Sequence, residues 1–353
     1  MTEVLSDIVK KRVESAAQQL NTANPLRYVA DMIDNSFYLP PGAAEYAVNA
    51  LAPGTLAFES SFSEKEPNDL RFTIEPCGPR SSPGSRRDEA TREMRRLVGS
   101  LYGRDALHWL DQVSEDFRGF APNARLDYGA WFGNAYDHDG LAAAKVYYEL
   151  SPGQIGALPP VLAALVRAAT AIMPNLVPLF TTIRCGRASG SQRVTFLHRG
   201  ALRVAELAPL MNQLGLGHQL PSLMQIVGIA LGGRFDLPER SVLLGLGEGA
   251  EGPEMKLEVL LGMIADLPPN FLDLLTLGLA ERPRQLHALG RWLHAFTPES
   301  AEWPGSFSVL SIRTTPRLPA RVSLYLRPAE FEIKRRLTDL TRIHPYAEGT
   351  VQG

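Results

Sequence analysis

Five basic side chains recur in the same sequence context, each on a stretch whose residues alternate between polar and apolar. They are Arg71, Lys145, Arg193, Lys256 and Arg321. An apolar residue follows each of them, and the next position is again polar: Thr73, Tyr147, Thr195, Glu258 and Ser323. If the five stretches face one chamber, the cations repel one another by roughly 4 kcal/mol per pair at about 4 Å and an effective dielectric near 20. The pattern therefore predicts a site for a multiply charged anion, and a diphosphate fits it better than a carboxylate.

The stretch from Ala144 to Leu150 shows the alternation most clearly. In an extended strand, Lys145, Tyr147 and Glu149 share one face, while Val146, Tyr148 and Leu150 share the other. One such stretch could be an ordinary strand with a solvated face, but the same register in five places favours a common interior. Tyr147 and Tyr325 have the phase of the cations, so their rings can stabilise a positive charge there. Tyr148 is predicted to pack against outer helices, and Glu149 has no predicted role.

The elements that must position these residues form five repeats of helix, strand, strand and helix. The predicted hairpins pair 56–62 with 70–76, 125–132 with 144–150, 177–185 with 192–198, 241–246 with 254–261 and 306–313 with 320–327. Predicted helices cover 5–20, 43–50, 88–102, 106–116, 159–173, 203–214, 221–231 and 269–296, and the tail from Ala329 is predicted to be helical and polar.

This pattern predicts an α+β fold in which ten antiparallel strands close into a barrel surrounded by helices. Closure satisfies every sheet edge, and apolar strand faces then turn outward to the helices. A barrel wider than about eight strands leaves room inside for a ligand. We expect a single domain over residues 1–353, with a lead-in over about 1–50 and a tail over about 329–353.

Composition restricts the possible partners. The net charge of −2 gives no general attraction to nucleic acid or to anionic membranes, so the ligands are expected to be small molecules. The absence of a run of about 18 apolar residues, together with a polar N-terminus, predicts a cytoplasmic protein. Two cysteines are too few for a disulfide scaffold and are expected to be reduced. The oligomeric state is expected to be a monomer or a homodimer.

Several short motifs, together with the five-fold pattern, resemble the ABBA or PT-barrel aromatic prenyltransferases, in particular the dimethylallyltryptophan synthase branch with its bacterial members. Phe58-Glu59-Ser60, followed twelve residues after the glutamate by Arg71, is similar to the first hairpin of that branch. Lys145-Val146-Tyr147 matches its Lys-x-Tyr motif, and Arg193 matches its third-repeat arginine. The resemblance covers residues from about 50 to 330.

The resemblance implies a role for each motif. Glu59 would accept a hydrogen bond from an indole N–H, and Tyr147 and Tyr325 would shield an allyl cation. The diphosphate would be held by Arg71, Lys145, Arg193, Lys256 and Arg321. The chain has Thr195 and Glu258 at positions where the family often has further basic or tyrosine residues. Asp127 and Glu258 are candidates for the base that removes the ring proton.

The implied reaction is Friedel–Crafts transfer of a prenyl group from dimethylallyl or geranyl diphosphate to an electron-rich aromatic acceptor in secondary metabolism, such as alkaloid biosynthesis. The acceptor is expected to be an indole or a tryptophan derivative. The chain contains no Asp-Asp-x-x-Asp motif, so the basic chamber is expected to replace Mg²⁺, with no metal and no cofactor required. The alternatives are a phenol, naphthoquinone or phenazine acceptor in the same fold, or a non-catalytic binding barrel.

Overall fold

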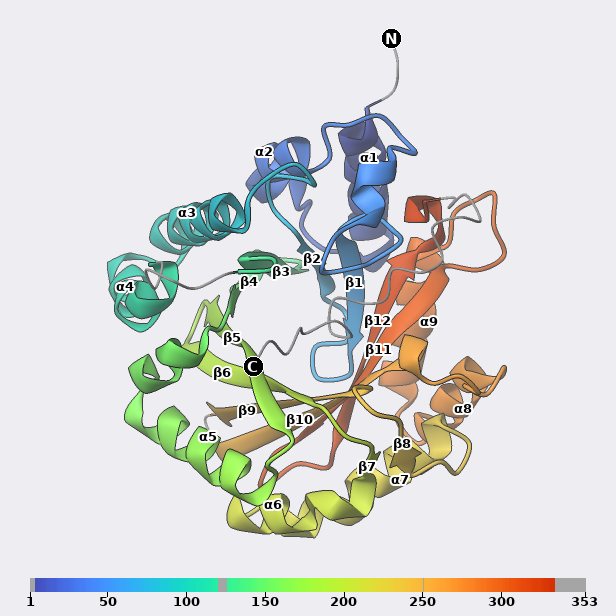
Figure 1. Ribbon diagram of the computed structural model, residues 1–353. Coiled ribbons are helices and arrows are strands. Elements are labelled where there is room, and N and C mark those ends of the chain that lie inside the picture. The colour runs from blue at the N-terminus through green and yellow to red at the C-terminus, as the bar shows by residue number, and fades with distance from the viewer. Residues whose placement is uncertain (1–3, 120–125, 250, 334–353) are drawn as a thin grey trace.

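The computed structural model describes residues 4–119, 126–249 and 251–333, and in this part of the chain ten strands form one closed antiparallel barrel. Helices lie around its outside, as the view in Figure 1 shows. The strand order is β1-β12-β11-β10-β9-β6-β5-β4-β3-β2, so each hairpin pairs with the hairpins before and after it. The predicted fold class is therefore confirmed.

The five hairpins follow one another along the chain. Their strands are β1 (Phe58–Ser63) with β2 (Leu70–Ile74), β3 (Ala130–Asp137) with β4 (Gly140–Glu149), β5 (Leu176–Gly186) with β6 (Gly190–His198), β9 (Val242–Gly249) with β10 (Gly252–Leu260), and β11 (Gly305–Thr314) with β12 (Arg321–Pro328). Two short strands, β7 (Leu202–Arg203) and β8 (Asp236–Leu237), pair outside the barrel. All five predicted pairings are present.

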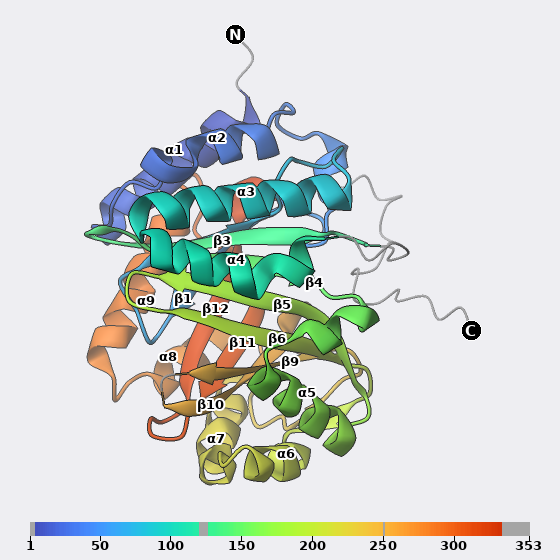
Figure 2. The same cartoon turned by 90° about the vertical axis from the view of Figure 1, so that its left-hand side faces the viewer.

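Helices fill the connections between hairpins. They are α1 (Leu5–Leu20), α2 (Leu26–Ser36), α3 (Pro83–Leu101), α4 (Arg104–Arg118), α5 (Pro160–Ile172), α6 (Ala208–Gln213), α7 (Leu220–Ala230), α8 (Phe271–Gly278) and α9 (Pro283–Phe296). Figure 2 shows α3 and α4 lying across the outer face of β3 to β5. None of the helices in the described ranges is both long and apolar enough to cross a membrane.

Some predicted helices are wrong in extent. The predicted helix over 43–50 is only a 3₁₀ turn, Ala44–Ala47, because the Asn49 amide donates to three nearby carbonyls and so competes with helical hydrogen bonding. The predicted helix over 203–214 begins as the 3₁₀ turn Val204–Leu207. The predicted helix over 269–296 is two helices, the second beginning at Pro283, where proline is best tolerated.

Two further differences concern the ends of the chain. Helix α2 is not among the predicted elements; it is kinked at Val29, whose backbone angles are not helical. Of the tail predicted to be helical, the described part holds only the 3₁₀ turn Ala329–Phe331. The remainder of that prediction lies outside the described residues.

The second hairpin begins later than predicted, at Ala130, because the chain turns sharply before it. Gly129 has φ +82°, and a Cβ there would lie 1.8 Å from the carbonyl oxygen of Pro83. The Glu149 carboxylate accepts hydrogen bonds from the backbone N–H groups of Asp127, Tyr128 and Gly129, at 2.7 to 3.1 Å. Glu149 therefore closes this turn, which gives it a structural role that the sequence pattern does not reveal.

The hydrophobic core lies between the barrel and the helices. The apolar residues that follow the five cations, Phe72, Val146, Val194, Leu257 and Val322, are all at most 3% exposed. Burial of each contributes roughly 1.5 to 3 kcal/mol. Tyr148 also faces outward, and its hydroxyl lies 2.8 Å from that of Thr91 on α3, as predicted. Since successive side chains point to opposite faces, this packing turns the cations inward.

Candidate active site

Within the described residues, two chambers lie in the barrel interior, at opposite ends. The hairpin turns surround one end, and the connections to helices surround the other. The chamber at the hairpin-turn end has a volume of about 440 Å³, and all five predicted cations line it. The chamber at the helix-linked end is smaller, about 100 Å³, and it contains Glu59. Lys145, Arg193 and Lys256, together with Tyr147 and Tyr325, line both chambers and so mark the boundary between them.

Three further cations line the hairpin-turn chamber: Lys65, Arg184 and Arg313. Arg184 lies directly across from Lys145 in the β4–β5 pairing, and Arg313 lies across from both Lys256 and Arg321. Their positions on the first strand or in the turn of a hairpin explain why comparison of the second strands misses them. The cross-strand register could have identified Arg184 and Arg313, because it places each of them opposite another cation. Like charges directly opposite are unfavourable unless an anion lies between them.

Carboxylates partly neutralise this chamber. Arg71 forms an ion pair with Glu66, and its second acidic neighbour, Asp69, is 3.4 Å away. Glu254 is paired with Arg313 and lies 3.9 Å from Arg193. The chamber lining holds eight basic residues and three acidic ones, Glu66, Glu248 and Glu254, which leaves an excess of five basic groups. These acidic residues are not among the predicted site residues.

Several buried donors in the chamber have no hydrogen-bond partner among the described residues. The Nε groups of Arg71, Arg193 and Arg313 are in this position. Burial lowers the pKa of Arg71 to about 10, which still leaves it charged at neutral pH. Burial and then Arg71, Arg184, Lys256 and Arg193 hold the pKa of Lys145 well below its ordinary value. Unpaired buried donors are costly, so the chamber is suited to an anion that accepts from several of them at once.

Aromatic rings form one wall of the helix-linked chamber. Trp131, Tyr147 and Phe180 line it, with ring centroids 5.6 to 6.3 Å apart. The Tyr147 hydroxyl is hydrogen-bonded to Thr73. Leu243, Leu260 and Val309 complete an apolar lining. Sequence reasoning identified only Tyr147 and Tyr325, because Trp131 and Phe180 lie on the first strands of their hairpins.

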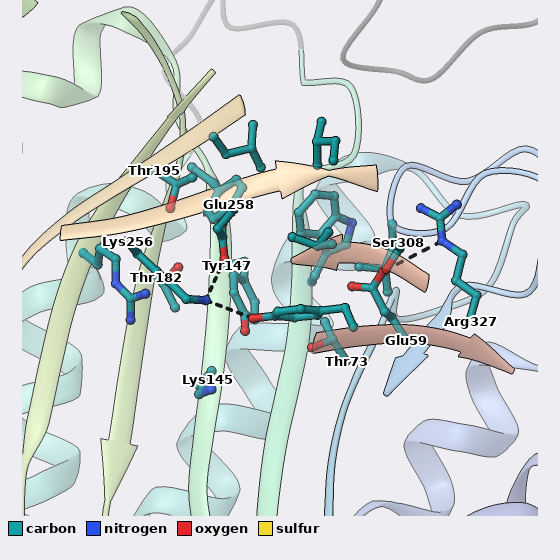
Figure 3. A pocket seen from close by; sticks show the side chains of 18 residues that line it. Glu59, Thr73, Lys145, Tyr147, Thr182, Thr195, Lys256, Glu258, Ser308 and Arg327 are labelled. Atoms are coloured by element: carbon teal, nitrogen blue, oxygen red, sulfur yellow. Dashed lines mark hydrogen bonds and ion pairs between the residues drawn. The ribbon is translucent and has the colours of Figure 1, made fainter. Parts of the chain in front are cut away.

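Glu59 is a buried carboxylate at the helix-linked end, where it is 7% exposed. Ser308 donates to it at 2.5 Å, and Arg327 Nε lies 3.8 Å from it. Figure 3 shows these three side chains grouped together, apart from Lys145 and Lys256. Ser308 lies where a bulge shifts the β11 register, and it lines the chamber. Burial raises the pKa of Glu59, although Arg327 and Ser308 oppose this.

Lys256 lines both chambers and contacts a carboxylate and a tyrosine between them. Its ammonium donates to Glu258 at 2.6 Å and to the Tyr325 hydroxyl at 3.0 Å, and lies 5.3 Å from the Tyr325 ring centroid. Glu258 therefore lies inside the barrel, as a candidate base requires. Asp127 does not, because it is an exposed residue of the turn before β3 and lines neither chamber. Of the two candidates for the base that removes the ring proton, the geometry therefore excludes Asp127 and is consistent with Glu258.

The segment from Asp137 to Gly140 forms the hairpin turn between β3 and β4. Asp137 accepts a bidentate ion pair from Arg187, and the Asp139 N–H donates to the Asp137 side chain. Ligand atoms of Asp137, His138 and Asp139 lie within 4.8 Å of one another. These contacts are those of a closed turn on the surface and belong to neither chamber.

The chain matches no protein-family model and no curated protein sequence. Its fold is similar to that of several solved prenyltransferases. The structure of 5-dimethylallyl tryptophan synthase from Streptomyces coelicolor with DMASPP and Trp has TM-score 0.69 and 16% identity, over 97% of this chain and 99% of that one. For 6-dimethylallyltryptophan synthase from Micromonospora olivasterospora with DMASPP and Trp, the values are 0.69 and 17%, over 95% and 100%. AnaPT from Neosartorya fischeri has TM-score 0.62 and 12% identity, over 95% and 100%.

Proposed function

We propose that this protein is an aromatic prenyltransferase that transfers a prenyl group from a prenyl diphosphate to an indole acceptor. The observation that carries the proposal is the pairing of the two chambers. A strongly cationic chamber adjoins an aromatic and apolar one that holds two buried carboxylates, Glu59 and the Lys256-paired Glu258. The similar solved structures named above include two with DMASPP and Trp, which supports the same pair of ligands here.

The cationic chamber would drive ionisation of the donor. As the carbon–oxygen bond breaks, negative charge grows on the leaving diphosphate, and fixed cations stabilise it without reorganising. Arg71, Arg193 and Arg321, with Lys145 and Lys256, are the residues that we assign to this role, joined by Arg184 and Arg313. Tyr147 and Tyr325 at the boundary would face the allyl cation and keep water away from it.

The helix-linked chamber would hold the acceptor ring against the allyl cation. An ionised Glu59 would accept the indole N–H, which orients the ring and raises its electron density. Attack by the ring carbon forms the new carbon–carbon bond and leaves a cationic ring, which then loses a proton to restore aromaticity. Glu258, held 2.6 Å from Lys256, is the described carboxylate that we assign as the proton acceptor.

A product screen tests the proposed function. The protein is incubated with dimethylallyl or geranyl diphosphate and with tryptophan, tryptophan-containing dipeptides, indole alkaloids and phenols, and product masses are read. We expect a mass increase of one prenyl group for an indole acceptor. Prenylation of phenols alone would support the alternative acceptor class. Tight binding of inorganic diphosphate with no product from any acceptor would instead support a non-catalytic binding barrel.

Metal independence is a separate prediction. Basic side chains line the hairpin-turn chamber, where we propose that the diphosphate binds. Their positive charge can neutralise the diphosphate in place of a bridging Mg²⁺ ion. With an active acceptor, we expect the rate in excess EDTA to stay within about twofold of the rate in Mg²⁺, because the protein supplies the charge. Loss of turnover in EDTA, with recovery on adding Mg²⁺, would contradict this prediction.

A further inference from the structure

Glu254 lies among the cations of the hairpin-turn chamber, where an anion-binding site has no evident use for a carboxylate. Its side chain is 11% exposed and contacts Arg313 and Arg193, which come from β11 and β6. It is located on β10 two residues before Lys256, so its side chain faces the same interior. Burial disfavours its ionised form, but Arg193 and Arg313 together outweigh burial, and the pKa of Glu254 lies below its ordinary value.

Glu254 lies against two guanidinium groups that a bound diphosphate would engage. Arg193 and Arg313 have buried Nε donors without a hydrogen-bond partner among the described residues, and Glu254 is the carboxylate nearest to both guanidinium groups. A diphosphate that engages these arginines must therefore approach a negative charge or displace it. Like charges at such short range repel one another, so the carboxylate opposes the incoming anion.

We propose that Glu254 is an internal counter-ion that competes with diphosphate for Arg193 and Arg313 and so favours release of the diphosphate product. This inference rests on the proposed function for the identity of the product. Inorganic diphosphate carries one more ionisable oxygen than its prenyl ester, so a fixed carboxylate opposes the product more than the donor. Glu254 acts through the two arginines, and it is therefore a positioning residue.

The variant Glu254→Gln tests this role, because it removes the charge and keeps the shape. We expect calorimetry to show inorganic diphosphate binding about tenfold more tightly, and the KM for the prenyl diphosphate to fall by less than that. We also expect the free variant to have a lower melting temperature than the wild type, with a larger rise on adding diphosphate. A merely structural ion pair would give weaker diphosphate binding in the variant.

Two control variants complete the experiment. Glu248→Gln removes an exposed carboxylate that lines the same chamber and has no ion pair with a described residue, so its diphosphate affinity should change less than twofold. Glu254→Asp keeps the charge and should bind diphosphate within about threefold of the wild type. Equal tightening in the Glu248 and Glu254 variants, or unchanged affinity in Glu254→Gln, would overturn the proposal.

The binding measurement is independent of catalysis. If no acceptor is prenylated but Glu254→Gln still tightens diphosphate binding, the counter-ion assignment holds and the proposed function fails. If prenyl transfer occurs and the variant binds diphosphate no more tightly, the proposed function holds and the counter-ion assignment fails.

Discussion

Replacing Lys145 with methionine is expected to lower kcat/KM for the prenyl diphosphate about 1,000-fold, a loss of roughly 4 kcal/mol. Lys145 lines both chambers and forms no ion pair with a carboxylate among the described residues. Its charge is therefore available to the diphosphate at the point where the donor bond breaks. Steady-state kinetics with varied donor, together with calorimetry of inorganic diphosphate, measures the loss.

The contribution of Lys145 to diphosphate affinity depends on pH, and the sign of this dependence follows from the lowered pKa of Lys145. Burial and four neighbouring cations lower the pKa of Lys145 in the free protein, whereas a bound diphosphate raises it. Binding is then coupled to proton uptake, and affinity for diphosphate falls as pH rises through the lowered pKa of the free protein. Calorimetry in two buffers with different ionisation enthalpies should detect this uptake in the wild type, and Lys145→Met should take up fewer protons on binding diphosphate.

The melting temperature of Lys145→Met distinguishes a loss of diphosphate binding from misfolding. A lysine with a lowered folded pKa destabilises the native state most below that folded pKa, and the cost falls as pH rises through it and is gone above the unfolded pKa of about 10.4. The melting temperature of Lys145→Met at neutral pH should therefore equal or exceed that of the wild type. Lys11→Met, on the exposed face of α1, is the matched control and should leave donor kinetics unchanged. Unchanged diphosphate affinity in Lys145→Met would contradict the prediction.

Replacing Glu59 with glutamine is expected to lower kcat/KM for indole acceptors about 100-fold, while diphosphate binding stays unchanged. The neutral amide accepts a weaker hydrogen bond from the ring N–H than a carboxylate does, and it stabilises the cationic ring intermediate less; together these effects are roughly 2 to 3 kcal/mol. Glu59 lines only the helix-linked chamber, which is why donor binding should be spared.

Substrate choice and pH provide the controls for Glu59. An N-methylindole has no N–H to donate, so Glu59→Gln should lose less rate on it than on an indole, because only the stabilisation of the cationic ring is then affected. Burial raises the pKa of Glu59, so the acceptor kcat/KM of the wild type should fall, as pH decreases, at a higher pH than an ordinary glutamate would give. Equal loss on indole and N-methylindole, or an unchanged acid limb in Glu59→Gln, would argue against this role.

The sequence pattern was sufficient to predict the barrel because each hairpin repeats a strict alternation. Arg71, Lys145 and Arg193 could be placed inward because the apolar residue after each had to be buried. The pairing partners could not be placed in the same way. The side chains of Arg184 and Arg313 face the chamber because of the register of their strands against the neighbouring strands. A one-residue error in a predicted turn would shift that register and turn both side chains to the outer face.

Other parts of the site depend on local irregularities that a periodic pattern does not contain. Ser308 lies at a register shift of β11, and Phe180 lies at the register shift of β5. Asp127 appeared as a strand residue because the sharp turn at Gly129 depends on close contact with Pro83, which is far away in the sequence. The role of Glu254 could not be predicted either, because it depends on contacts with arginines from two other strands.

The two ends of the barrel are built from different kinds of connection, and this has an evolutionary consequence. Short turns within hairpins surround the cationic chamber, whereas the longer segments that join one repeat to the next surround the chamber of Glu59. Under the proposed function, insertions and substitutions in those longer segments would alter the acceptor end and leave the donor end unchanged. Under the proposed function, the chemical step and the choice of acceptor would thus depend on different parts of the chain, and exchanging inter-repeat segments should change acceptor scope while diphosphate affinity stays the same.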